Sequence, residues 1–257
     1  KTGRHKDLLK LLSRLIDLAE SPAARSVIRL ESAQICLEKL DAVAEATEHL
    51  RAVLDEEPGD AKATELLAQL YEKTGRDDDL ASLFSQQIDL AKERADVAAE
   101  LTYSVKLGEV YEVRLNDTKR AIDTYLSVLE RDGRHKGALF ALARLYEHRN
   151  EKAEAAKMLE TYLGEVSGEE AVKTALRLAD LFTALKDEAA VRKTLERGLA
   201  ADEKAPEVRT RLLALYEKQQ AWAELATLIT GNAEMATAVP EKIMLFRKAA
   251  DIHLTKR

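Results

Sequence analysis

The chain has 257 residues, of which 46% are hydrophobic and 33% are charged, so it can bury a sizeable core. Ten glycines and four prolines are too few for the turns of a many-stranded β fold, and the apolar content argues against a disordered chain. The formal net charge is −6, with the acidic excess concentrated in residues 51–100. No segment is strongly basic, which argues against nucleic-acid binding, and no apolar run approaches the roughly 20 residues of a membrane-spanning helix.

Apolar residues recur three, four and seven positions apart along the chain, which predicts amphipathic helices and an all-α fold. The predicted helices cover residues 5–19, 23–39, 42–55, 60–74, 77–92, 95–114, 117–131, 135–149, 152–165, 168–185, 187–201, 205–219, 221–234 and 239–256. Short polar breaks separate them. All four prolines fall between pairs of helices, where a helix must begin or end.

The sequence is also internally repetitive. Residues 1–19 and 73–91 are identical at twelve of nineteen positions. A second motif, Leu-small-x-x-aromatic, recurs with its last residue at Cys36, Tyr71, Tyr111, Tyr146, Phe182, Tyr216 and His253. These positions are 35, 40, 35, 36, 34 and 37 residues apart. The small residue predicts a close crossing of two helices, and the longest spacing predicts a longer helix at 95–114.

This pattern resembles the tetratricopeptide repeat, a helix–turn–helix unit with a period near 34 residues. The second-helix motif matches at Ala121-x-x-x-Tyr125 and Ala155-x-x-x-Leu159, and Pro58 stands where the family often has a terminal proline. The resemblance covers essentially the whole chain. The repeats of this chain are similar to those of long bacterial arrays of the family. It implies a right-handed superhelical α-solenoid of about six full repeats with a half repeat at each end. Cys36, His253 and Leu213 depart from the motif.

The expected array is a single domain with a partial unit at each end. Its units are residues 1–22, 23–58, 59–94, 95–133, 134–167, 168–204, 205–238 and 239–257. Both terminal helices carry apolar faces without a polar cap. We favour a segment of a larger multi-repeat protein, whose native N-terminus lies outside this sequence. The alternative is that the ends pack against another chain. Such uncapped helices predict self-association or fraying.

The sequence contains no pattern typical of an active site. It has no phosphate-binding loop, and its five histidines do not form pairs at metal-ligand spacing. Cys36 is interpreted as a small buried hydrophobe rather than a reactive thiol. The acidic clusters lie at turns and helix starts, where they complement the helix dipole. We therefore expect no catalytic residue, cofactor or metal, and a chain that is not an enzyme.

In the tetratricopeptide family the first helices of the units line a concave face, and residues flanking the small residue point into it. The resemblance thus implies a partner-binding surface made of Val105, Glu109, Glu112, Phe140, Arg144, Glu147, Leu176 and Asp180. Apolar and acidic residues together favour a basic or amphipathic protein or peptide partner. The alternative is that the glutamates are merely solvated helix formers. Phe140 is the candidate anchor.

Three function classes follow, and a protein–protein interaction scaffold is favoured. The second is a regulatory or sensor segment attached to an enzyme, or to a secretion or envelope machinery domain, elsewhere in a longer chain. The third, an RNA-binding repeat, fits the charge distribution least. The compartment stays open, with the cytoplasm slightly favoured, as do the partner and the oligomeric state.

Overall fold

The computed structural model describes residues 2–256, and every regular element in that range is helical. The chain divides into two compact units, one ending at Gly133 and the other beginning at Arg134. The first unit contains α1 (Thr2–Leu18), α2 (Pro22–Ile35), η1 (Cys36–Leu40), α3 (Val43–Glu56), α4 (Ala61–Thr74), α5 (Asp77–Glu93), α6 (Val97–Glu109), η2 (Val110–Arg114) and α7 (Thr118–Arg131). The second contains α8 (Lys136–His148), α9 (Lys152–Leu163), α10 (Gly168–Ala184), α11 (Glu188–Ala201), α12 (Pro206–Lys218), α13 (Trp222–Met235) and α14 (Val239–Thr255).

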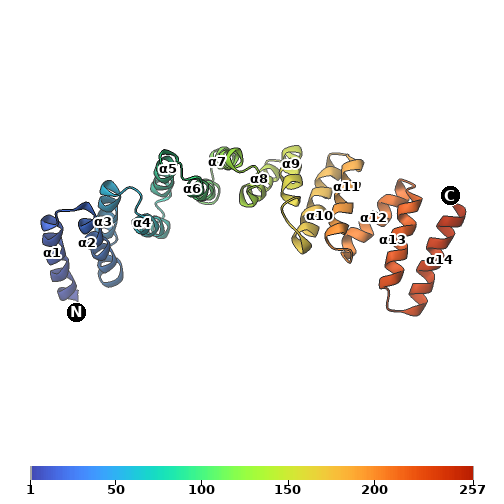
Figure 1. The fold of residues 1–257 in the computed structure, drawn as a ribbon, viewed down its shortest axis with the longest axis horizontal. Helices are drawn as coiled ribbons and strands as arrows, with labels where there is room; N and C mark the ends of the chain where they lie inside the picture. Colours follow the sequence, from blue (N-terminus) through green and yellow to red (C-terminus); the bar gives the residue numbers. More distant parts are fainter. Residues whose placement is uncertain (1, 257) are drawn as a thin grey trace. The chain divides into compact units, whose positions relative to one another are not determined.

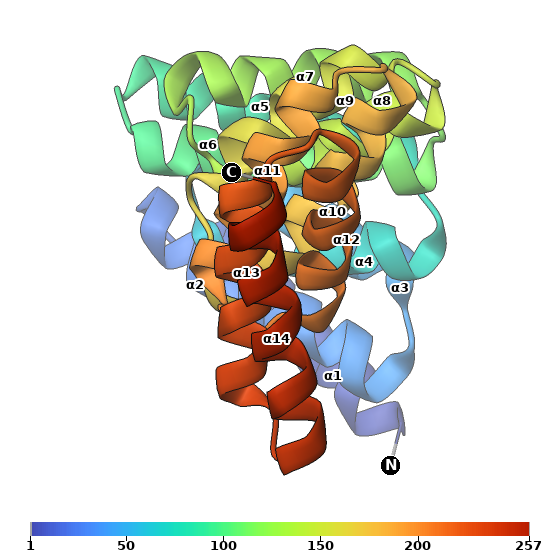
Figure 2. The same cartoon turned by 90° about the vertical axis from the view of Figure 1, so that its right-hand side faces the viewer.

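Within each unit, consecutive helices pack side by side as hairpins (Figure 1), as α13 and α14 also show in the turned view (Figure 2). The predicted all-α fold of helix–turn–helix repeats is confirmed. When η1 and η2 are counted as the last turns of α2 and α6, every helix end lies within three residues of its expected position. We call the even-numbered helices the first helices of the repeats and the odd-numbered helices the second helices.

Side chains at the helix starts explain why the helices begin where they do. The carboxylates of Asp60, Asp96, Asp117 and Asp187 each accept a hydrogen bond from the backbone N–H three residues later, at 2.7–3.0 Å. Each carboxylate thereby satisfies a donor that has no partner inside the helix. These four aspartates are thus helix caps. Of the acidic clusters interpreted from the sequence, Asp77–Asp79 do lie in the first turn of α5, whereas Glu56 and Glu57 lie at the end of α3, where they do not complement the helix dipole.

The turn from a first to a second helix ends in a similar way in all six complete repeats. Each turn contains one residue in the left-handed region, namely Asp41, Gly75, Asn116, Asn150, Lys186 or Gln220. The N–H of the next residue donates to the carbonyl at the aromatic position of the motif, at 2.7–2.9 Å. This closing bond is a common way to end a helix, and it stops every first helix at an equivalent point.

The two turns that follow Cys36 and Tyr111 differ by one residue. The left-handed residue follows the small residue by seven positions in four repeats, but by eight positions after Ala33 and Gly108. The extra residue is held in the π-helical turns η1 and η2, which precede these two turns. The predicted long helix at 95–114 is therefore confirmed as the continuous run of α6 and η2, whose last turn is π-helical.

The small residue of the motif lies where two helices cross, as predicted. A Cβ on Gly108 would lie 2.6 Å from the ring of Tyr125, which is only 1% exposed in α7. Ala143 and Ala179 occupy the same position in α8 and α10 and are buried. A larger side chain at this position would force the two helices of the hairpin apart.

Apolar side chains are exposed on both terminal helices. Leu11 and Leu15 of α1 are 56% and 49% exposed, whereas their counterparts 72 residues later, Leu83 and Gln87 of α5, are buried. On α14 the exposed apolar side chains are Val239, Ile243, Met244, Phe246 and Leu254. Both terminal helices therefore carry exposed apolar side chains, as predicted from the sequence.

Candidate partner-binding face

The eight residues predicted to bind a partner all lie on first helices, but they belong to two different units. Val105 and Glu109 of α6 and Glu112 of η2 belong to the first unit. The second unit holds the other five, Phe140, Arg144 and Glu147 on α8 and Leu176 and Asp180 on α10. Each set is therefore considered within its own unit.

Phe140 is the largest exposed apolar side chain of the predicted set, with 42% of its surface accessible. Its ring centroid lies 5.4 Å from that of Tyr162 in α9, and the two rings are tilted by 45°. The guanidinium carbon of Arg177 in α10 lies 5.2 Å from the Phe140 centroid. Phe140 therefore has contacts within the fold and still presents an accessible ring.

Arg177 joins α8 to α10, and sequence reasoning did not single it out. Its Nε and Nη2 donate to the two carboxylate oxygens of Glu147 at 2.8 and 2.9 Å, a bidentate ion pair. An ion pair also links α10 to α12, where Nη1 of Arg211 lies 2.5 Å from a carboxylate oxygen of Asp180. Both arginines precede the small-residue position by two, and this shared spacing is the signal that could have identified them.

These ion pairs change the expected chemistry of the face. Glu147 and Asp180 already have cationic partners within the unit. In the first unit, Glu112 accepts a hydrogen bond of 3.4 Å from the hydroxyl of Tyr125. Glu109 is exposed and Val105 is half-buried. The acidic residues therefore attract a basic partner less than isolated carboxylates would. The apolar Phe140 and Leu176 are accordingly the stronger candidates for the contact area.

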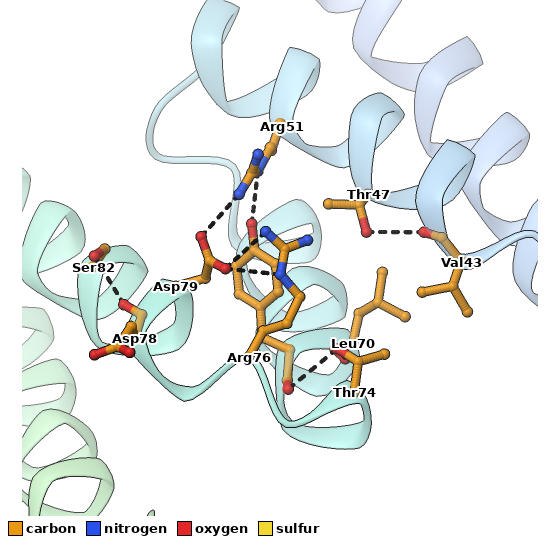
Figure 3. A network of polar contacts seen from close by, with 10 residues as sticks. Val43, Thr47, Arg51, Leu70, Thr74, Arg76, Asp78, Asp79 and Ser82 are labelled. Carbon is orange, nitrogen blue, oxygen red and sulfur yellow. Dashed lines mark hydrogen bonds and ion pairs between the residues drawn. The ribbon is translucent and has the colours of Figure 1, made fainter. Parts of the chain in front are cut away.

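On the side of the second helices, an arginine and an acid surround the tyrosine of the motif. Arg51 donates to the hydroxyl of Tyr71 at 2.7 Å and to Asp79 at 3.1 Å, and Arg76 also binds Asp79, at 2.7 Å (Figure 3). In the second unit, Tyr216 donates to Glu196 at 3.0 Å. Burial, together with this bond to Glu196, raises the pKa of Tyr216 to about 12.

The described residues form several open clefts. Clefts of about 230, 570 and 530 Å³ lie between second helices, over α4, α6 and α12 respectively. Another cleft, of about 300 Å³, lies between the first helices α10 and α12. Among the described residues, no group of three His, Cys, Asp or Glu side chains is arranged to hold a metal ion. Burial, assisted by the charge of Glu45, raises the pKa of the Cys36 thiol and so disfavours the nucleophilic thiolate.

No helix of the described chain is both long and apolar enough to span a membrane.

Comparison with known proteins gives a family match in each unit. Residues 63–98 and 138–172 match the family model described as tetratricopeptide repeat. No curated protein matches the sequence.

Several solved structures are similar at low identity. One is a tetratricopeptide repeat protein from Parabacteroides merdae, 16% identical, with a TM-score of 0.46 over 88% of this chain and 93% of that one. Another is BtubC from P. vanneervenii, 15% identical, with a TM-score of 0.42 over 95% of this chain and 91% of that one. With TM-scores below 0.5, these superpositions add no functional information.

Proposed function

Since one segment of each unit matches the tetratricopeptide repeat family, we propose that the chain is a protein–protein interaction scaffold. Its first helices bind a segment of a partner protein, and its role is binding rather than catalysis. The observation that carries the proposal is Phe140, an aromatic side chain of a first helix that remains 42% exposed. Large aromatic side chains are the most frequent anchors of protein interfaces.

The binding surface in the second unit is centred on Phe140 and Leu176, with Arg144 and Asp180 at its edge. Arg177 and Glu147 hold α8 and α10 together beside Phe140 through their bidentate pair. A surface fixed in this way loses little conformational freedom when a partner binds. Val105, Glu109 and Glu112 form the corresponding surface of the first unit. We propose an amphipathic partner segment whose apolar side chains cover Phe140 and Leu176.

Replacing Phe140 by alanine is expected to weaken partner binding by about 2 kcal/mol, a typical loss at an interface anchor. The same change removes the contacts with Tyr162 and Arg177, so the melting temperature should fall modestly. The partner is first captured with the intact protein and identified. Its dissociation constant is then measured by calorimetry at a temperature where both variants are folded.

Leu185→Ala is the matched control, because Leu185 is 41% exposed in the same unit but lies outside the predicted groove positions. It should leave the affinity unchanged. A large loss of stability in Phe140→Ala, with wild-type affinity in the folded fraction, would mean that Phe140 serves packing alone.

We further propose that this polypeptide self-associates through the exposed apolar faces of α1 and α14. Leu11 and Leu15 on α1, and Ile243 and Phe246 on α14, are the side chains that support this. The double variant Ile243→Asp, Phe246→Asp should lower the average mass measured by sedimentation equilibrium. A wild-type chain that stays monomeric at every tested concentration would refute self-association.

A further inference from the structure

A second candidate binding site lies on the side of the second helices, in the cleft between α11 and α13 with α12 as its floor. The cleft has a volume of about 530 Å³, within the range of ligand-binding sites. Most of its accessible lining is apolar, with Leu199, Ala200, Tyr216, Ala223 and Leu228 as its main walls. None of the residues predicted to form the partner-binding face lines it.

This cleft has a counterpart 145 residues earlier, between α3 and α5 over α4. The pairs Leu54 and Leu199, Tyr71 and Tyr216, and Leu83 and Leu228 occupy equivalent positions. The earlier cleft is much smaller, about 230 Å³, and carries Asp55 and Gln86 where the later one has Ala200 and Gly231. The wide apolar cleft is therefore a property of these particular residues and not of the repeat fold.

A buried arginine forms part of the later cleft. Arg209 is 8% exposed, and its equivalent in the earlier cleft is the small Thr64. Its guanidinium donates to the side-chain oxygen of Asn232, to the carbonyl of Glu203 at 2.5 Å and to the carbonyl of Leu228 at 3.2 Å. Gly231 leaves room for it, since a Cβ there would lie 2.8 Å from Nη2.

Arg209 consequently has binding capacity to spare. A guanidinium has five N–H donors, and three are used by these neutral oxygens. Burial lowers the pKa of Arg209, and the nearby negative charge of Glu203 offsets this effect only in part. Backbone carbonyls of a bound segment are suitable acceptors for the remaining donors.

The rim of the cleft is acidic. It carries Glu196, Glu203 and Glu224. Arg192 pairs with two of them, Glu196 at 2.9 Å and Glu224 at 2.6 Å. The carboxylate of Glu203 is exposed, and its negative charge acts on the buried Arg209. Three carboxylates stand against the two cations Arg192 and Arg209, so one negative charge is left over, and this favours a basic group on the occupant.

We propose that the α11–α13 cleft is a second docking site, which binds a partner peptide segment that combines apolar side chains with a neighbouring lysine or arginine. The apolar side chains fill the space beside Ala200 and Ala223, and the basic side chain pairs with Glu203. Carbonyl oxygens of the segment accept hydrogen bonds from Arg209. The site does not depend on the proposed groove around Phe140.

The test uses three pentapeptides with blocked ends as probes. The first alternates lysine with leucine, the second alternates glutamate with leucine, and the third alternates lysine with alanine. Chemical-shift changes in the full 257-residue chain are followed by NMR at Leu199, Thr227 and Leu228. The lysine–leucine peptide should shift these signals, and the other two should bind more weakly. Ala223→Phe fills the cleft and should raise the dissociation constant about tenfold or more. Glu203→Gln should raise it about two- to fivefold, as for a partly exposed ion pair.

Ala153→Phe is the matched control, because Ala153 is also exposed at the second position of a second helix in the same unit. Both this variant and Phe140→Ala should bind the lysine–leucine peptide like the wild type. The proposal is overturned if the cleft signals do not shift, or if Ala223→Phe binds as tightly as Ala153→Phe. Tighter binding of the glutamate–leucine peptide would also overturn it, since Arg209 would then select an acidic segment.

Discussion

Replacement of Tyr125 by alanine is expected to lower the free energy of unfolding by about 3–5 kcal/mol, the range for a large aromatic side chain in a core. Tyr125 is the largest of the fully buried side chains and lies against the backbone of Gly108. Its removal leaves a cavity at the helix crossing that the two packed helices can close only in part. Urea unfolding followed by circular dichroism measures the change.

The matched control is Tyr125→Phe, which keeps the ring and removes the hydroxyl that bonds to Glu112. It should cost about 1 kcal/mol. Gly108→Ala tests the same contact from the other side, because the added methyl group meets the Tyr125 ring. Alone it should destabilise the protein, but in the Tyr125→Ala background it enters the cavity and should be nearly neutral or stabilising. Additive effects of the two changes would contradict a direct contact.

Replacement of Leu212 by alanine is expected to lower the stability by about 2–5 kcal/mol. Leu212 is fully buried in α12 and belongs to the core of the second unit. In a repeat protein each repeat contacts mainly its neighbours, so the loss should be local. Hydrogen exchange should accelerate most in α11, α12 and α13, and less in α3, α4 and α5.

Leu185→Ala is the control here too, because this exposed leucine should change stability by no more than about 0.5 kcal/mol. Equal acceleration of exchange in α4 and α12 after Leu212→Ala would argue that the two units unfold together. An unchanged urea midpoint would contradict the burial of Leu212.

The helices could be predicted from the sequence because the motif combines two independent signals. The apolar period gives the buried face, and the small residue before the aromatic marks the crossing, as the contact of Gly108 with Tyr125 confirms. The turn conformation could not be predicted in the same way. Among the six left-handed turn residues only Gly75 is a glycine. Lys186 and Gln220 are residue types that do not favour this conformation, so the sequence does not indicate it at their positions.

The candidate face was harder to predict for a related reason. Helical spacing places Phe140 and Glu147 on a first helix, but it does not say which side chains of the neighbouring helix reach them. Arg177 lies 30 positions after Glu147, and only the packing of α8 on α10 brings the two together. The pair of clefts over α4 and α12 likewise depends on differences of a single side chain, such as Gln86 and Gly231.

The two π-helical turns have a consequence for how such a chain tolerates insertions. One residue added to an α-helix rotates every later side chain by about 100°, which would turn the apolar face of the next segment away from its neighbour. Here the added residue is confined to η1 or η2, and the helix still closes on the carbonyl of Cys36 or Tyr111. The following helices α3 and α7 start from the usual left-handed residue and keep their register. An array built in this way can gain or lose one residue at the end of a first helix without repacking the repeats beyond it.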